Sequence, residues 1–211
     1  KIYVIHSEHS PIDPKPRGAP FLCIDIASGD VLWQISLRGT DWGGNPVIGD
    51  SIIAMYNTYD QQVYALGKGP SAMTVSIQDD VVSLGESVLI KGTITDVSPG
   101  LTDVGLTARF PNGVPVVADE DMSVWMEYVY MQFPRPEASG VDIRLEMIDS
   151  DGVATEIGWT KSDSNGFFKV LWKPSTEGTY TIRASFMGSL AFYKSFAETA
   201  VGVTPAVSPA T

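Results

Sequence analysis

Cysteine is almost absent from this sequence of 211 residues, which contains only Cys23. One cysteine cannot form an intrachain disulfide, and it cannot supply a zinc site made of four cysteines. Its apolar neighbours Leu22 and Ile24 predict a buried structural thiol, since no histidine or lysine lies beside it in sequence to activate it. The lack of disulfides is typical of cytosolic proteins, but many surface proteins of prokaryotes share it.

Histidine is nearly as scarce, because the sequence has only His6 and His9. This argues against a serine–histidine triad, and the chain also lacks a Gly-x-Ser-x-Gly elbow, a Walker loop and a dinucleotide fingerprint. A metal site could use His6, Glu8 and His9, but the strand period sends the two histidines to opposite faces. Carboxylates are plentiful, yet nothing in the sequence brings two of them together as in a glycosidase. We therefore expect no catalytic residues and no enzymatic activity.

Charge is also sparse, since only 18% of the residues are charged, with a net charge of −11. An acidic surface repels phosphate backbones, so nucleic acid is not an expected partner. No apolar run is long enough for a membrane span. The sequence begins at Lys1 and not at methionine, so we expect either a removed leader or a segment of a longer protein. Residues 204–211 have the small, proline-rich composition of a linker tail.

What the sequence does contain is β-forming residues and turn residues. Hydrophobic residues make up 44% of the chain, enough for a packed core. Residues 7–20 hold four prolines and predict a loop. Apolar runs separated by turn residues predict short strands over residues 1–6, 21–26, 31–37, 46–48, 51–57 and 62–66. Repeated short strands of this kind are typical of β-propeller blades.

One stretch of the first third has a family motif. Cys23-x-Asp25-x-x-Ser28-Gly29-x-x-x-Trp33 resembles the tryptophan-docking motif of quinoprotein-type (PQQ-like) β-propellers, Ala-x-Asp-x-x-Thr-Gly-x-x-x-Trp, with Cys for Ala and Ser for Thr. Asp25 and Ser28 can hydrogen-bond the turn backbone, Gly29 supplies an unusual φ, and Trp33 buries a large ring between blades. These four residues are therefore predicted to be a structural docking motif.

The resemblance implies part of a propeller and no cofactor. A propeller needs at least four blades, and residues 1–67 hold only about 1.5 of them. The blades that would line a central quinone site lie outside this sequence, so we expect no cofactor and no cofactor-binding residues. A blade remnant would have exposed edges, which we expect to pack on the second domain or on another copy of the chain.

After a predicted hinge at residues 68–70, the pattern changes to longer alternating strands. Residues 71–203 predict an immunoglobulin-like (Ig-like) β-sandwich of seven strands. Tyr180 after Glu177-Gly-Thr resembles a tyrosine corner, in which the phenol binds backbone upstream. The segments 67–71, 163–168 and 197–203 resemble Ig-like modules that follow PQQ-like propellers in archaeal cell-surface proteins. The fold class is therefore predicted to be all-β: a partial blade sheet followed by an Ig-like sandwich.

Residues 96–140 form a predicted insertion in the sandwich, and they contain the one helix that we expect. Asp119 is predicted to be its N-cap, with acidic residues in the first turn, and Phe133-Pro134 ends it. The side chains of Trp125, Tyr128, Tyr130 and Phe133 offer a possible interaction face. The alternative, which we favour, is that the helix covers the open end of the sandwich or the blade strands.

The turns at Asp149-Ser-Asp-Gly152 and Asp163-Ser-Asn-Gly166 are rich in oxygen ligands. Calcium needs six to eight oxygens, and neither turn has EF-hand spacing or a distal bidentate glutamate. The turn-forming role of aspartate, asparagine and glycine accounts for both, so we predict no metal ligands there.

These observations predict a non-enzymatic structural, adhesion or interaction module, extracellular or on the cell surface. Its expected partners are another copy of the chain or another cell-surface protein. Two alternatives stay open: a carbohydrate- or ligand-binding module that uses the aromatic insertion, and a C-terminal fragment of a quinoprotein-like enzyme.

Overall fold

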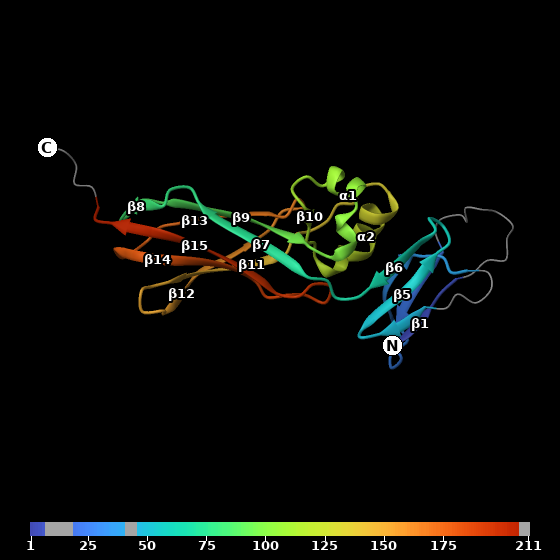
Figure 1. Cartoon of the computed structure of the whole chain (residues 1–211). Coiled ribbons are helices and arrows are strands. Elements are labelled where there is room, and N and C mark those ends of the chain that lie inside the picture. Colours follow the sequence, from blue (N-terminus) through green and yellow to red (C-terminus); the bar gives the residue numbers. More distant parts are fainter. Residues whose placement is uncertain (7–18, 41–45, 207–211) are drawn as a thin grey trace. The chain divides into compact units, whose positions relative to one another are not determined.

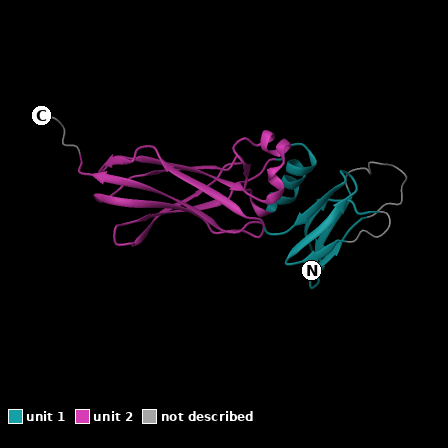
Figure 2. Cartoon of the chain, in the orientation of Figure 1, with its two compact units in different colours: residues 1–68, 120–136 teal, residues 69–119, 137–211 magenta. Residues whose placement is uncertain are grey.

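The computed structural model describes residues 1–6, 19–40 and 46–206. The chain is an all-β protein with several sheets and two compact units (Figures 1 and 2). The first unit comprises residues 1–68 and 120–136, and the second comprises residues 69–119 and 137–211. The predicted proline-rich loop falls mostly on residues 7–18, which lie outside the described residues, as do the last five residues of the predicted tail.

The first unit contains two antiparallel sheets of three strands and one helix. The first sheet has the order β1-β2-β3, and the second has the order β4-β5-β6. Asp50 and Ser51 have φ angles of 49° and 65° and join β4 to β5, as a two-residue hairpin turn requires. The strands are β1 (Ile2–Val4), β2 (Pro20–Ile24), β3 (Val31–Ser36), β4 (Val47–Gly49), β5 (Ile52–Asn57) and β6 (Gln62–Leu66), and the helix is α2 (Met122–Met131).

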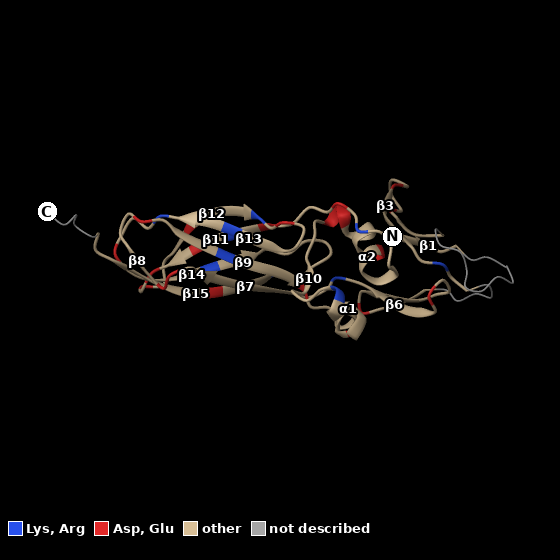
Figure 3. Ribbon diagram, turned by 90° about the horizontal axis from the view of Figure 1, so that it is seen from above, with Lys and Arg blue, Asp and Glu red and all other residues tan. Residues whose placement is uncertain are grey.

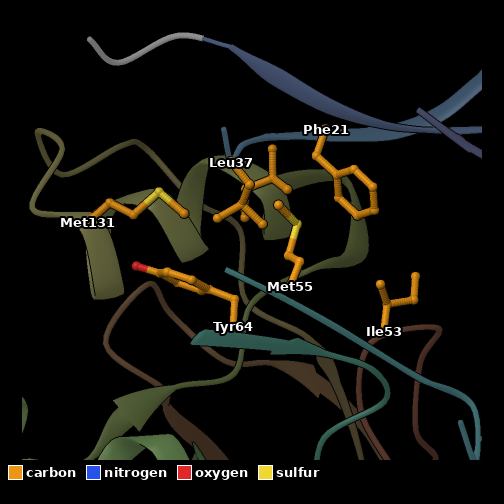
Figure 4. Close-up of a cluster of buried hydrophobic side chains, with 7 residues drawn as sticks. Phe21, Leu37, Ile53, Met55, Tyr64 and Met131 are labelled. Carbon is orange, nitrogen blue, oxygen red and sulfur yellow. The ribbon is translucent and has the colours of Figure 1, made fainter. Parts of the chain in front are cut away.

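The core of the first unit draws side chains from both sheets and from α2 (Figure 4). Strand alternation sends every second side chain of a strand to the inner face, and the buried members lie on that face. Met131 of α2 joins them, although it is far away in sequence. The buried residues are Phe21, Ile35, Leu37, Ile53, Met55, Tyr64 and Met131.

The second unit is a β-sandwich of nine strands in two sheets (Figure 1). One sheet has β7, β9, β10 and β13, and the other has the order β12-β11-β14-β15-β8. The strands are β7 (Ser71–Ile77), β8 (Val81–Ser83), β9 (Val88–Asp96), β10 (Val114–Pro115), β11 (Asp142–Ile148), β12 (Ala154–Lys161), β13 (Phe167–Trp172), β14 (Gly178–Phe186) and β15 (Ser195–Thr204).

This strand order is that of an Ig-like fold. The strands β7, β9 and β13 correspond to A, B and E of one sheet, and β11, β14 and β15 correspond to C, F and G of the other. The alternation predicted for β9, β11 and β14 is present, since their inward residues include Ile90, Leu145 and Ile182, all fully buried. The predicted number of strands was wrong, because β8 and β10 were missed; both are shorter than four residues.

The tyrosine corner predicted at Tyr180 is present at the start of β14. Its phenol donates toward the carbonyl oxygens of Thr176 and Glu177, each at 3.2 Å, and lies 2.7 Å from Thr176 Oγ1. Its ring packs edge-on against Trp172, with the ring centroids 6.2 Å apart. These contacts fix the connection between β13 and β14, which belong to different sheets.

The helical segment differs from the prediction in the number of helices and in the N-cap of α2. A second helix, α1 (Val104–Arg109), is present, and its N-cap Asp103 accepts hydrogen bonds from the backbone of Gly105 and Leu106. The short 3₁₀ turns η1 (Pro99–Thr102) and η2 (Asp119–Asp121) precede α1 and α2. None of the helices in the described residues is long and apolar enough to cross a membrane.

The predicted N-cap of α2 was also wrong. Its N-cap is Asp121, and its first turn has no acidic residue. The Asp119 carboxylate instead accepts hydrogen bonds from Ser189 Oγ and from the backbone of Leu190 and Ala191, at 2.8–2.9 Å. A carboxylate that holds three donors of a distant loop is not available to cap a helix. The end of α2 is as predicted, since Gln132 adopts a left-handed φ of 58° just before Phe133-Pro134.

The tyrosine corner gives a stability prediction. In Tyr180→Phe the ring remains, but the carbonyls of Thr176 and Glu177 lose their donor. We expect the free energy of unfolding to fall by about 1–3 kcal/mol, measured by urea denaturation. Tyr56→Phe is the matched control, because that exposed phenol has no hydrogen bond to any described residue, and it should change little. An unchanged midpoint for Tyr180→Phe would mean that the corner does not stabilise the sandwich.

Candidate functional site

The turn between β2 and β3 is built by the residues of the docking motif. Asp25 Oδ1 accepts hydrogen bonds from the backbone of Ala27 at 2.8 Å and of Ser28 at 3.4 Å. Ser28 Oγ accepts from the backbone of Asp30 at 3.2 Å, and the Gly29 N–H donates to the Asp25 carbonyl at 2.8 Å. Gly29 has a φ of 80°, which favours glycine. Asp25, Ser28 and Gly29 thus each have a role in forming the turn.

The Asp25 carboxylate also forms an ion pair with Lys1. This hydrogen bond and those from the backbone of Ala27 and Ser28 lower the pKa of Asp25 from 3.8 to about 2. The side chain therefore stays ionised at any pH where proteins normally function. The pair is at the surface, where its effect is local to the turn.

Trp33 packs against aromatic residues of its own sheet. Its ring lies 5.6 Å from that of Phe21, edge-on, and 6.1 Å from that of Tyr3, measured between centroids. Trp33 is partly buried at the border of the core of the first unit, and Cys23, its cross-strand partner, is buried. Docking of Trp33 against a neighbouring blade stays a prediction.

The predicted aromatic interaction face of α2 is not an open surface. Trp125 is only 2% exposed, and its ring lies 5.3 Å from Tyr128 and under the Arg135 guanidinium at 5.8 Å. Tyr130 packs edge-on against Tyr64 at 6.3 Å, and Phe133 also packs on the core. Tyr130 and Phe133 pack on the core of the first unit, whereas the ring of Trp125 contacts Tyr128 and Arg135. The helix thus packs over strands of the first unit, and whether these strands are a propeller blade stays a prediction.

A hydrogen bond also anchors α2 to the edge of the first sheet. Glu127 Oε1 accepts from the backbone N–H of Ser36 at 2.7 Å. Strand β3 is an edge strand of its sheet, and its outward N–H groups would otherwise need water or another chain. The helix therefore satisfies part of an edge that the sequence led us to expect to be exposed.

The sequence did not point to the outer face of the sheet β4-β5-β6, which is apolar and exposed. Val63 is 73% exposed and Val47 is 66% exposed, and Tyr56 lies directly opposite Val63 in the register. None of the six strands of the unit contains a charged residue, and β1, β3 and β6 are drawn without charge colour in Figure 3. Apolar residues at both alternating positions are the signal that could have revealed this face.

The candidate metal positions have other roles in the described residues. His6 Nδ1 lies 2.7 Å from the carbonyl oxygen of Pro20 and donates to it, while Glu8 and His9 lie outside the described residues. Asp149 Oδ1 accepts from the backbone of Asp151 and Val153, and Asp163 Oδ1 accepts from that of Asn165 and Phe167. Across residues 1–6, 19–40 and 46–206, no group of three metal-binding side chains comes together.

The Asp25 turn gives a prediction on pH. A lowered pKa in the folded state means that the ion pair stabilises the turn above about pH 4 and loses this effect as the pH falls towards 2. We expect the Asp25 carboxyl carbon to titrate near pH 2 by NMR, and nearer its ordinary value in Lys1→Met. A midpoint for Asp25 that Lys1→Met leaves unchanged would contradict the role of the ion pair.

No protein-family model matches the sequence, and no curated protein matches it. Among solved structures, the chain is similar to the CARDB domain of a protein from Pyrococcus furiosus, at 12% identity and a TM-score of 0.32, over 64% of this chain and 94% of that domain. It is also similar to a tetra-tandem repeat in the extending region of a large adhesion protein, at 14% identity and a TM-score of 0.38, over 87% of this chain and 37% of that one. A β-glucosidase from Listeria innocua matches at 12% identity and a TM-score of 0.33, over 68% of this chain and 18% of the enzyme. TM-scores of this size do not establish a common fold, so the Ig-like assignment depends on the strand order itself.

Proposed function

We propose that this chain is a non-enzymatic structural or adhesion module of the cell surface, and that it self-associates through the first unit. The observation that carries the proposal is the outer face of the sheet β4-β5-β6. The strands of this sheet contain no charged residue, and Val47, Ile52, Tyr56 and Val63 are all exposed on them. A contiguous apolar patch on a soluble surface is typical of a docking site.

The edges of the same sheet favour association as well. Strands β4 and β6 flank β5, so each has one row of backbone groups without a strand partner among the described residues of this unit. Natural proteins protect such edges with lysine, proline or bulges, and neither strand contains any of these. The docking surface that we propose is therefore the apolar face together with its two edges, and its occupant is the same sheet of a second copy.

The motif at Asp25, Ser28, Gly29 and Trp33 supports a finer proposal about origin. We propose that the first unit is the last part of a PQQ-like propeller, of the kind found in archaeal cell-surface proteins. Two three-stranded meanders in succession fit two incomplete blades. In a longer protein, the strands that complete these two blades would pair with the same edges in place of a second copy. The apolar face would then pack within the propeller.

The second unit would then act as an extracellular module that follows the blade strands in sequence. An Ig-like sandwich supports many functions, so the fold alone assigns none. Its tyrosine corner and the buried residues of its inner faces hold it together without any disulfide. That combination suits a structural module, and no cofactor is part of the proposal.

Val63→Lys tests the docking surface. A charge within an apolar contact removes the burial of one valine and adds a desolvation cost. We expect the chain to self-associate in sedimentation velocity at about 0.5 M NaCl, where charge contacts are screened, and its dissociation constant to rise by at least about tenfold in the variant.

Val153→Lys is the matched control, since Val153 is equally an exposed valine but lies in a turn of the sandwich. Tyr56→Lys provides a second change on the docking surface if Val63→Lys disturbs folding. A chain that is monomeric at high salt, or one whose association survives both surface variants, would overturn the proposed docking surface.

A further inference from the structure

The outer face of the sheet β12-β11-β14-β15 has two exposed aromatic rings in one row. The register places Trp159 opposite Arg144, Arg144 opposite Ser185, and Ser185 opposite Phe196. Residues that are directly paired across antiparallel strands lie on the same face. Trp159 is 53% exposed and Phe196 is 63% exposed, so both rings are open to solvent. Trp159 and Phe196 are three strand spacings apart, a distance of about 14 Å.

The neighbouring row consists of charged residues, which form two separate groups of ion pairs. Across the same four strands, Glu156 lies opposite Glu146, Glu146 lies opposite Arg183, and Arg183 lies opposite Glu198. Arg144 contacts Glu146 and Glu156, each at 3.0 Å, and Arg183 contacts Glu198 at 2.6 Å. The Arg183 guanidinium also lies 5.4 Å from the centre of the Phe196 ring. Polar side chains between the rings are therefore held in fixed positions by their partners.

A β-bulge brings the edge strand into this arrangement. Trp159 and Glu156 are three residues apart, so in a regular strand their side chains would lie on opposite faces. The register shifts between Leu145 and Glu146, which leaves Ile157 as the extra residue of β12. Gly158 makes the shift possible with a φ of 148°, a conformation that favours glycine. The bulge thus places both Trp159 and Glu156 on the outer face.

We propose that this row is a binding site for a neutral, β-linked polysaccharide, with Trp159 and Phe196 as stacking platforms. Such a polymer has flat apolar ring faces, which suit exposed aromatic rings, and hydroxyl groups at its edges. Arg144 and Arg183 have more N–H donors than their ion pairs use, and the exposed glutamates have free acceptor positions. On binding, the sugar hydroxyls replace their hydrogen bonds to water with hydrogen bonds to these donors and acceptors.

The charge of the face favours this class of ligand over others. The row of glutamates and the net charge of −11 repel a polyanion. A protein partner would have to desolvate the ion pairs at the centre of the face, which is costly, whereas protein interfaces usually have an apolar centre. The site is separate from the docking surface of the first unit, so the proposal does not depend on the proposed function.

The test is binding of the full chain to cellohexaose, chitohexaose and mannohexaose, with hexagalacturonate as the anionic comparison, by isothermal titration calorimetry. We expect binding to at least one neutral hexasaccharide and none to hexagalacturonate. Trp159→Ala and Phe196→Ala should each weaken the binding by about tenfold, and Trp159→Phe should retain most of it. Leu171→Ala is the matched control, because Leu171 is exposed on β13 of the other sheet.

The outcomes separate this site from the docking surface. Val63→Lys should leave sugar binding unchanged, and Trp159→Ala should leave self-association at high salt unchanged. Absence of binding to all three neutral hexasaccharides overturns the proposal, and so does binding that survives both Trp159→Ala and Phe196→Ala. Binding of hexagalacturonate that is as strong as that of the neutral sugars overturns the ligand class.

Discussion

The first unit depends on the burial of one face of two small sheets beneath the helix α2. Small sheets gain stability by packing a hydrophobic face against another element, and each of these sheets buries one face in the shared core. The cluster from Phe21 to Tyr64 is completed by Met131, which comes from a segment more than fifty residues further along the chain. Glu127 adds a hydrogen bond to the edge strand β3 through Ser36. Tyr130 and Phe133 are used for this packing, and Trp125 is buried as well, which is why these rings are not an open recognition surface.

The same constraint explains the surface that is left over. Six strands without a charged residue are suited to being covered on both faces, but α2 and the opposite sheet account for the inner faces only. The outer face with Val63 and Val47 is therefore as apolar as a protein core, although it is exposed to solvent. The sandwich differs, because the outer face of its sheet β12-β11-β14-β15-β8 contains charged residues that pair with one another, as Arg183 and Glu198 do. The two units thus present different chemistry to solvent, and different partners suit them.

Local features of the fold could be predicted from the sequence, and features that depend on distant segments could not. The strands, the inward residues of β9, β11 and β14, and the tyrosine corner at Tyr180 follow from alternation and from turn residues that are close in sequence. The role of Asp119 was missed because its hydrogen-bond donors lie about seventy residues away, at Ser189 to Ala191. The helix α1 was missed because glycine and proline dominate its surroundings, and the short strands β8 and β10 have too few residues for a pattern.

The candidate sites show the same division. The hydrogen bonds of Asp25 and Ser28 are local and follow from the motif, whereas the row from Trp159 to Phe196 spans four strands and is set by their register. A reading of the sequence without the bulge at Gly158 would put Trp159 and Glu156 on opposite faces. One glycine therefore decides whether the edge strand contributes a ring and a carboxylate to the same surface. Because an alanine at this position would meet no neighbouring atoms but would have to adopt a φ of 148°, the glycine is required by the backbone and not by packing. A surface that depends on a backbone conformation in this way is assembled by the fold, and only the register of the strands reveals it.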